Sequence, residues 1–391
     1  MKPVAPGAWL GLLGGGQLGR MFTMAAQSMG YRVIVVDPGE HSPAGSVADH
    51  HIRSDYFDIA TLDELAHRCA AVTTEFENVP AEALRRLASH CVVSPSADSV
   101  GVAQDRACEK RFLAGIGLDT APFAVIASET DLERVDPSLL PGILKRARFG
   151  YDGKGQARVA TVAEAKVALR AMDGALCVLE RHLQLEIELS VVVARGFDGE
   201  VRTYPVAENR HVDGVLDVSV VPARIPPPLA QAARDATVRV AEALDYRGVL
   251  CVEYFVVGGK LLANEIAPRP HNSGHYSIDA CFTSQFEQQV RVMCGLPLGD
   301  TALHCPAVMV NLLGDLWSGG EPAWRHVLTH PRAKLHLYGK TEARPGRKMC
   351  HYTLLDAEVA GALRAAAQIR SALEEGTRLP APSTLAVEGA R

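Results

Sequence analysis

Two glutamates near residue 260 have the types and spacing of a divalent-cation site. Glu253 lies in VLCVEYFVV and Glu265 in KLLANEIA, and both segments have the apolar, β-branched composition of strands joined at Gly258–Gly259. A two-residue turn would pair Glu253 with Asn264 and send Glu265 to the opposite face. A three-residue loop that includes Lys260 would instead pair the two glutamates directly.

Direct pairing of the two acids carries a chemical consequence. Two carboxylates opposite each other repel unless a cation lies between them, and hard oxygen ligands close to phosphates are typical of a Mg²⁺ site. The pattern therefore predicts a metal site made by Glu253 and Glu265, with Asn264 beside them. The alternative is a pair of solvated acids on an edge hairpin.

A polar run, PRPHNSGHY at 268–276, follows the second of these strands. Arg269 has the planar fork that binds a carboxylate or bicarbonate, and a neutral His271 could accept or donate a proton. His271 and His275 lie four residues apart, but no helix is expected beside the prolines and no HExxH acid is present, so zinc is disfavoured. A loop held by its own hydrogen bonds is the other interpretation.

A glycine-rich segment, GYDGKGQ at 150–156, follows the expected strand PGILKRA. Gly153 and Gly155 flank Lys154, and Lys145 lies on the preceding strand. Such a flap can cover and neutralise phosphates, although the Walker A pattern is absent. A flexible hairpin tip with solvated charge is the alternative.

A second glycine cluster lies near the N-terminus. Gly14, Gly16 and Gly19 satisfy G-x-G-x-x-G between an expected strand and an expected helix, and Asp37 ends the next strand. Glycines allow close backbone approach and a helix N-terminus favours an anion. A dinucleotide, another phosphate ligand and a tight turn without a ligand all remain open from this segment.

These residues need elements to position them. A strand at 8–14, a helix, the strand YRVIVVD, a helix near 61–70, a strand near 71–74, a helix after Pro80 and the strand CVVS predict an α/β domain over 1–120. Residues 121–300 alternate strands with a helix near 228–245, an α+β pattern. Residues 301–391 hold the short strands AVMVNLL and AKLHLYG and an Ala-rich helix near 356–375.

Composition excludes several classes of protein. The 391 residues are 48 % hydrophobic and 22 % charged with a net charge of −5, which disfavours nucleic acid and membrane surfaces as partners. Nine scattered cysteines without close metal spacing indicate reduced thiols. No apolar run is long enough to span a membrane, so we expect a cytoplasmic protein.

Six segments taken in order carry a family resemblance: GGGQLGRM (14–21), TEFENVP (74–80), GYDGKGQ (150–156), NEIAPRPHNSGH (264–275), QFEQQVR (285–291) and LYGK with RPGRKM (337–349). Together they resemble the N5-carboxyaminoimidazole ribonucleotide synthetases, which are ATP-grasp enzymes of purine biosynthesis. The resemblance implies an ATP-grasp fold, with an N-terminal Rossmann-like (pre-ATP-grasp) domain and a small C-terminal domain that completes the nucleotide-substrate site.

The resemblance also implies a reaction and its partners. ATP phosphorylates bicarbonate to carboxyphosphate, and the amine of 5-aminoimidazole ribonucleotide captures the CO₂ unit to give the N5-carbamate, ADP and phosphate. ATP and Mg²⁺ are the implied cofactors, and a homodimer is expected. The first glycine cluster would then bind a ribotide and not a dinucleotide.

Site residues follow from the resemblance position by position. The implied ATP site consists of Arg106, Lys145, Gly150, Tyr151, Asp152, Gly153, Lys154, Gly155, Gln156, Glu180, Arg181, His182, Leu183, Glu188, His211, Asn264 and Glu265. The implied metal ligands are Glu253 and Glu265. The implied ribotide site consists of Gly16, Gln17, Leu18, Glu75, Tyr151, Lys340, Arg347 and Lys348, and the implied catalytic residues are Asp152, Arg269, His271 and Lys340.

Two departures and three alternatives complete the sequence-based account. Cys350 replaces a usual glycine in RKMGH, where a side chain could alter a tight turn, and Phe149 replaces a common glycine and could stiffen the flap. The alternatives are an ATP-grasp ligase or transformylase acting on glycinamide ribonucleotide, a Rossmann NAD(P) oxidoreductase and a non-catalytic nucleotide-binding module. NADH titration would test the oxidoreductase.

Overall fold

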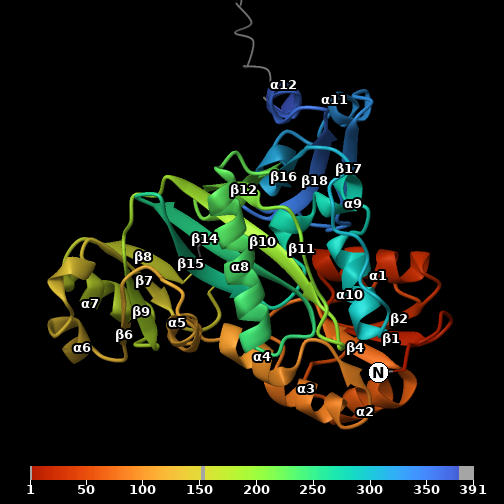
Figure 1. Ribbon diagram of the computed structural model, residues 1–391, viewed down its shortest axis with the longest axis horizontal. Helices are drawn as coiled ribbons and strands as arrows, with labels where there is room; N and C mark the ends of the chain where they lie inside the picture. The colour runs from red at the N-terminus through yellow and green to blue at the C-terminus, as the bar shows by residue number, and fades with distance from the viewer. Residues whose placement is uncertain (1, 151–154, 378–391) are drawn as a thin grey trace, which may run out of the picture.

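Three β-sheets organise the protein. The computed structural model describes residues 2–150 and 155–377. A five-stranded sheet lies at the N-terminal end, a four-stranded sheet lies at the opposite side, and a nine-stranded sheet spans the middle and continues into the C-terminal region (Figure 1). The candidate site residues come from the places where these three parts meet.

The N-terminal sheet is parallel, with strand order β3-β2-β1-β4-β5. Its strands are β1 (Trp9–Leu13), β2 (Arg32–Val36), β3 (His50–Ile52), β4 (Ala71–Thr74) and β5 (Val92–Val93). Its helices are α1 (Gln17–Ser28), α2 (Ile59–Arg68), α3 (Ala81–Ala88) and α4 (Ala97–Ala103). Both faces are covered, as the apolar strands require, and the expected βαβ beginning is confirmed.

The small sheet, in the order β6-β9-β7-β8, follows helix α5 (Arg106–Gly115). It contains β6 (Phe123–Ile126), β7 (Gly142–Arg146), β8 (Gln156–Val159) and β9 (Cys177–Arg181), with α6 (Glu129–Glu133), η1 (Pro137–Leu139) and α7 (Val162–Ala171) packed against it. Antiparallel β7 and β8 flank the glycine-rich segment, so Lys145 on β7 pairs with Gln156 on β8.

The large sheet runs in the order β15-β14-β10-β12-β13-β16-β18-β17, with β11 paired to β10. Its first strands are β10 (Ile187–Arg195), β11 (Val201–Thr203), β12 (Ala207–Val212), β13 (Val215–Val221), β14 (Gly248–Val257) and β15 (Lys260–Ala267). Helix α8 (Pro227–Ala243) covers β10, β14 and β15 through an apolar cluster. Then follow η2 (Asn272–Gly274), α9 (Ser277–Ala280) and α10 (Gln285–Met293).

The C-terminal strands extend this same sheet. They are β16 (Ala307–Leu313), β17 (Ala333–Leu337) and β18 (Lys348–Leu355), accompanied by η3 (Gly314–Trp317), α11 (Arg325–Leu328) and α12 (Val359–Thr377). Helix α10 packs into the apolar cluster of α1, β1 and β2. The large sheet contains strands from both sides of residue 300. We therefore propose that the segments 1–120, 121–300 and 301–391 differ in what they bind and not in which sheet they form. Within the described ranges, no helix is both long and apolar enough to cross a membrane.

Candidate active site

The two glutamates of the hairpin lie directly opposite each other. The turn has two residues, so Val257 pairs with Lys260 and Tyr254 with Ala263. A register shift then inserts Asn264 as an extra residue, and Glu253 pairs with Glu265. The expected facing pair is therefore present, but the expected cause, a three-residue loop, is wrong. A β-bulge restores the alternation that a two-residue turn alone would break.

The charges around this pair suit a hard cation. Burial raises the pKa of Glu253, His211 opposes that effect, and the charges of Glu265 and Glu188 raise the pKa further. The Asn264 amide nitrogen lies 3.4 Å from Glu253 Oε2, and its buried Oδ1 has no hydrogen-bond partner. In the described ranges no three His, Cys, Asp or Glu side chains gather as a metal cluster. Two carboxylates and one amide oxygen nevertheless fit Mg²⁺, which takes its other ligands from phosphates and water.

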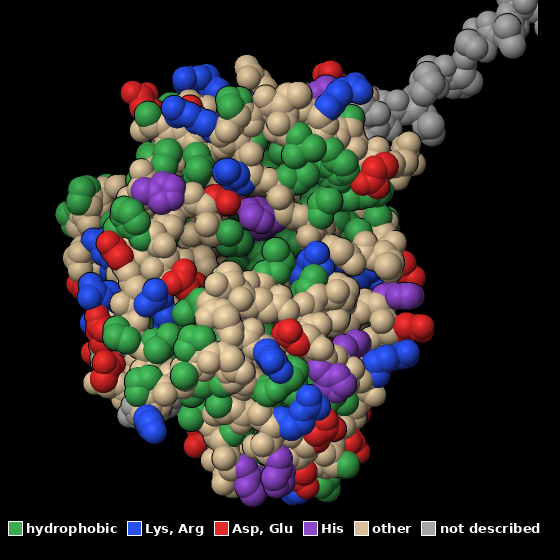
Figure 2. All heavy atoms as spheres, turned by 90° about the vertical axis from the view of Figure 1, so that its right-hand side faces the viewer, with side chains coloured by type: hydrophobic (Ala, Val, Ile, Leu, Met, Phe, Trp, Pro, Cys, Tyr) green, Lys and Arg blue, Asp and Glu red, His purple; other side chains and the backbone are tan. Residues whose placement is uncertain are grey.

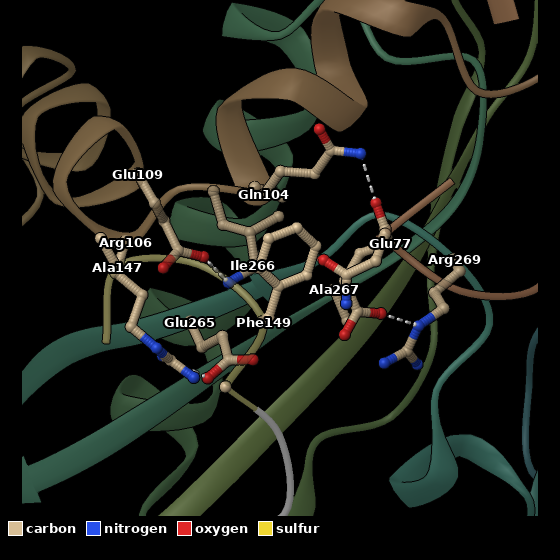
Figure 3. Close-up of a pocket in the computed structure, with 13 residues that line it drawn as sticks. Glu77, Gln104, Arg106, Glu109, Ala147, Phe149, Glu265, Ile266, Ala267 and Arg269 are labelled. Carbon is tan, nitrogen blue, oxygen red and sulfur yellow. Dashed lines mark hydrogen bonds and ion pairs between the residues drawn. The ribbon is translucent and has the colours of Figure 1, made fainter. Parts of the chain in front are cut away.

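Arg106 holds the second glutamate. Its guanidinium donates to Glu265 Oε2 at 2.8 Å, and this pair lies at the wall of the pocket in Figure 3. Burial raises the pKa of Glu265, but Arg106, followed by Lys145 and Arg269, brings the net pKa below its usual value. The carboxylate is therefore charged at neutral pH, as a metal ligand must be.

Lys145 lies beside the glycine-rich segment in a buried ion-pair network. Its Nζ donates to Glu180 at 2.9 Å, and Lys110 approaches the same carboxylate at 3.5 Å. The side chain of Lys110 is fully buried. Arg181 and His182 follow Glu180 and are exposed, and Leu183 is half-buried.

Glu188 and His211 face each other across strands β10 and β12, joined by a short hydrogen bond. Burial lowers the pKa of His211, but the Glu188 bond and the charges of Glu253 and Glu188 raise it overall. This pair therefore extends the charged site from β14 and β15 toward β12.

Arg269 lies on the other side of the pocket, and His271 follows it two residues later in the chain. Arg269 Nε donates to Glu77 Oε2 at 2.6 Å, and Figure 3 shows its remaining nitrogens pointing away from that carboxylate. His271 Nε2 is 3.4 Å from Glu253 Oε1, and its Nδ1 is 2.8 Å from Ser273 Oγ. Burial, followed by the charge of Arg269, holds the pKa of His271 well below its usual value, so His271 is neutral.

A small, open hollow lies among some of these groups. Glu77, Arg106, Gly150, Glu265 and Arg269 line it together with Phe149, whose ring projects into the middle of the view in Figure 3. Phe149 is 70 % exposed and adopts a φ of 62°, a conformation that is costly for a bulky residue. The glycine expected at this position would carry no such strain.

The first glycine cluster binds carboxylates of its own chain. The amides of Gly16 and Gly19 donate to the two Glu75 oxygens at 2.5 and 2.7 Å, at the N-terminus of α1. The Gly15 amide and the Tyr56 hydroxyl donate to Asp37 Oδ2 at 2.8 and 2.9 Å. Asp37 is thus engaged in the turn and not presented to a ribose, which counts against the NAD(P) alternative.

The expected ribotide residues from the two ends of the chain meet beside this turn. Lys340 Nζ donates to Gln17 Oε1 and to the Lys348 carbonyl, the latter at 2.6 Å. Arg347 is half-buried and donates to the Glu342 carbonyl at 3.0 Å. A second hollow, of about 200 Å³, is lined by Leu18 and Glu75, among others.

Some expectations fall outside this geometry. Tyr151, Asp152, Gly153 and Lys154 lie outside the described residues. Cys350 does not lie in a tight turn: it is buried within β18, opposite Leu312 and Leu337, so that expectation is wrong. A strand position accepts a side chain that a glycine turn would not.

Sequence reasoning missed Glu109 and Lys110 on α5. Burial and the charge of Glu265 raise the pKa of Glu109 to about 8, while Arg106 and the Ile266 amide oppose the rise. The signal was present: Asp105 is a helix N-cap, and charged residues at 106, 109 and 110 share one helix face.

Comparisons with known families divide the chain into three consecutive matches. Residues 8–104 match the ribonucleotide synthetase preATP-grasp domain, residues 111–286 the ATP-grasp domain, and residues 307–365 the phosphoribosylaminoimidazole carboxylase C-terminal domain. These matches cover all three sheets described above.

Whole-chain relatives agree with this division. The N5-carboxyaminoimidazole ribonucleotide synthase of Bacillus subtilis is 43 % identical over 90 % of this chain and 92 % of its own, and that of Brucella melitensis is 46 % identical over 89 % and 96 %. The crystal structure of an N5-carboxyaminoimidazole ribonucleotide synthetase in complex with ADP superposes with a TM-score of 0.90 at 39 % identity, covering 97 % of this chain and 100 % of that one. The Aspergillus clavatus enzyme in complex with ADP and 5-aminoimidazole ribonucleotide gives 0.86 at 30 %, covering 94 % and 99 %. The chain therefore belongs to the N5-carboxyaminoimidazole ribonucleotide synthase family of ATP-grasp enzymes.

Proposed function

We propose that this chain uses ATP and bicarbonate to carboxylate 5-aminoimidazole ribonucleotide, through carboxyphosphate, to N5-carboxyaminoimidazole ribonucleotide. The ATP-dependent carboxylation of this ribotide in purine biosynthesis is the activity of its family. The single observation that supports the finer proposal is the grouping of Arg269 and neutral His271 beside the facing carboxylates. His271 Nε2 lies 3.4 Å from Glu253 Oε1, and Arg269 lines the same hollow as Glu265.

The phosphate-binding part of the mechanism follows from the charged groups. Lys145 and Arg106 would donate to the phosphate oxygens of ATP, each already oriented by a carboxylate. Glu253, Glu265 and Asn264 would hold Mg²⁺, which supplies neutralisation of the charge that phosphoryl transfer spreads over those oxygens. Positioning and charge are what this chemistry requires, and both are present here.

The bicarbonate part follows from Arg269 and His271. Glu77 accepts from Arg269 Nε, and the Pro270 carbonyl accepts one hydrogen of Nη1 at 3.2 Å. Nη2 and the second hydrogen of Nη1 can then donate to a planar anion. Nδ1 of the neutral His271 accepts from the Ser273 amide at 3.3 Å, so the ring proton lies on Nε2, which is 3.4 Å from Glu253 Oε1 and can donate a hydrogen bond there. Carboxyphosphate hydrolyses readily, so exclusion of water from the hollow by Phe149 and its neighbours would protect it.

The ribotide would lie between the glycine turn and the C-terminal strands. Gly16, Gln17, Leu18 and Glu75 would contact it from one side, and Lys340, Arg347 and Lys348 would reach its phosphate. Because the turn amides already bind Glu75, the phosphate charge would be met by these basic side chains instead.

Release of ADP is the direct test. Purified protein with ATP and Mg²⁺ should release ADP rapidly only when both bicarbonate and 5-aminoimidazole ribonucleotide are present. Formate with glycinamide ribonucleotide serves as the matched alternative substrate pair. Turnover with that pair, or tight NADH binding, would contradict the proposal.

We also propose a cytoplasmic homodimer. The family resemblance supports it, and apolar side chains remain exposed on α1 (Met24) and on β17 (Leu337). On the face shown in Figure 2, hydrophobic side chains gather in the upper half, over the C-terminal elements. Light scattering of the purified chain should give twice the mass of 41.9 kDa, and a monomer at micromolar concentration would contradict it.

A further inference from the structure

Strand β15 is the edge of the large sheet and carries the bulge at Asn264, so its outer backbone groups need partners that the sheet does not supply. The Asp119 carbonyl accepts from one of them, the Ala263 amide, at 2.7 Å. An extra residue in one strand interrupts the ladder locally and leaves backbone groups unpaired. A buried backbone group without a partner is destabilising. Without the bulge, Asn264 would face Glu253 and the Glu265 side chain would turn to the other side of the sheet.

One face of helix α5 supplies those partners. Lys110 Nζ donates to the Asn264 carbonyl at 3.1 Å, and Glu109 Oε1 accepts from the Ile266 amide at 2.5 Å. Arg106, one turn earlier, binds the Glu265 side chain between them. Figure 3 shows Glu109 and Arg106 reaching from the helix to the strand.

The helix is itself fixed at its start. The Asp105 side chain accepts from the Ala107 and Cys108 amides at 2.9 and 3.1 Å. Spacing of i, i+3 and i+4 places the side chains of 106, 109 and 110 on one face. Lys110 also approaches Glu180 at 3.5 Å, and Glu180 binds Lys145. The same lysine thus connects the bulged strand with the proposed phosphate-binding lysine.

We propose that Glu109 and Lys110 are positioning residues: they hold β15 in the bulged register that places Glu265 opposite Glu253. Neither side chain needs to touch ATP or the metal. Glu109 acts as an acceptor for one backbone amide, and Lys110 acts as a donor to one backbone carbonyl. The expected effect on metal binding rests on the proposed function, whereas the proposed effect on the register of β15 does not.

The first test measures the strand without metal or substrates. Hydrogen–deuterium exchange of the segment 260–267 should accelerate at least about tenfold in Glu109→Leu and Lys110→Met, because a buried backbone group that loses its partner favours local opening by about that factor or more. Glu109→Gln keeps an oxygen that accepts from Ile266 and should exchange like the unaltered protein. Unchanged exchange in Glu109→Leu would overturn the proposal.

The second test measures the metal site. Mn²⁺ binding in the presence of ADP, followed by electron paramagnetic resonance, should weaken about tenfold or more in Glu109→Leu and Lys110→Met and stay near normal in Glu109→Gln. If exchange changes as expected but the unaltered protein neither binds Mn²⁺ nor releases ADP, the proposed function fails while the register inference stands. Equal losses in Glu109→Gln and Glu109→Leu would overturn the role of Glu109 as an acceptor.

Asp217 provides a matched control in the same sheet. It lies on β13 and pairs with Arg370 of α12, far along the sheet from β15. Asp217→Asn should lower the melting temperature but leave exchange at 260–267 and Mn²⁺ affinity unchanged. If it reproduced the effects of Glu109→Leu, those effects would reflect general loss of stability and the proposal would fall.

Discussion

The glycine turn at 14–19 and the hairpin of β14 and β15 both contain buried carboxylates, but the two regions give these carboxylates different partners. Glu75 receives two backbone amides at the start of α1, which oppose, without cancelling, the rise in pKa that its burial causes. Glu253 faces another carboxylate, and burial together with its acidic neighbours raises its pKa despite His211. The first arrangement is complete without a ligand, whereas the second gains from a cation. Internal satisfaction therefore separates a structural acid from one available for chemistry.

Removing a charge from the glutamate pair should produce the largest effect. Glu265→Gln relieves the repulsion but removes a hard anionic ligand, so we expect Mg²⁺-dependent ADP release to fall at least about a hundredfold with folding intact. Steady-state ADP release and circular dichroism measure both. Unchanged turnover would remove Glu265 from the metal site. Glu40→Gln, an exposed acid paired only loosely with Arg53, is the control.

Arg269→Lys should have the next largest effect. Lysine cannot bind Glu77 through one nitrogen and present two others to bicarbonate. We expect the bicarbonate concentration needed for half-maximal rate to rise about tenfold, with ADP released in excess of carboxylated product. Arg291→Lys, at an ion pair with Glu287 on α10, should leave this coupling normal. Coupled kinetics in Arg269→Lys would exclude Arg269 from bicarbonate binding.

At the glycine turn, Glu75→Gln should mainly affect stability. The substitution replaces one carboxylate oxygen, which accepts from a backbone amide of Gly16 or Gly19, by an NH₂ group that can only donate. The free energy of unfolding should therefore fall by about 1–3 kcal/mol. Urea denaturation measures the change. Affinity for the ribotide should weaken as well, while Mn²⁺ binding with ADP stays normal. Loss of Mn²⁺ binding in Glu75→Gln would contradict the claim that the glycine turn and the metal site are separate regions.

The smallest effect concerns His275 and His351, two buried histidines from different segments whose rings lie 4.9 Å apart in the core. Burial lowers the pKa of His275 and His351 well below the usual 6.5, so the folded protein binds fewer protons than the unfolded chain. Their stability contribution is complete above about pH 6.5 and decreases as the pH falls below it, by up to about 1.4 kcal/mol per histidine and pH unit.

Urea denaturation at pH 7.5 and 5.5 should reveal that loss, and His351→Gln should reduce it. The Tyr338 hydroxyl, 2.9 Å from His351 Nδ1, can still bond to a glutamine. A protein equally stable at both pH values would contradict the assignment of these histidines to the neutral core.

Much of the fold could be predicted from local patterns. The first strand, helix and strand, the helix at 228–245 and the hairpin strands appear near their expected bounds, because their apolar periodicity reflects burial directly. The C-terminal strands were recognised only in part: β18 was missed, and nothing local indicated that β16–β18 would extend the large sheet. Sheet membership depends on neighbours that are distant in the chain.

The sequence by itself determined the family, the chemistry and most of the candidate residues, since side-chain types and their order carry that information. Only the tertiary structure decided that Glu75 closes the glycine turn and that a bulge, not a longer loop, makes Glu253 face Glu265. The bulge is held by Glu109, which lies 157 residues from Ile266 along the chain. A strand's register is set by donors and acceptors that folding brings from elsewhere, and no local spacing encodes them.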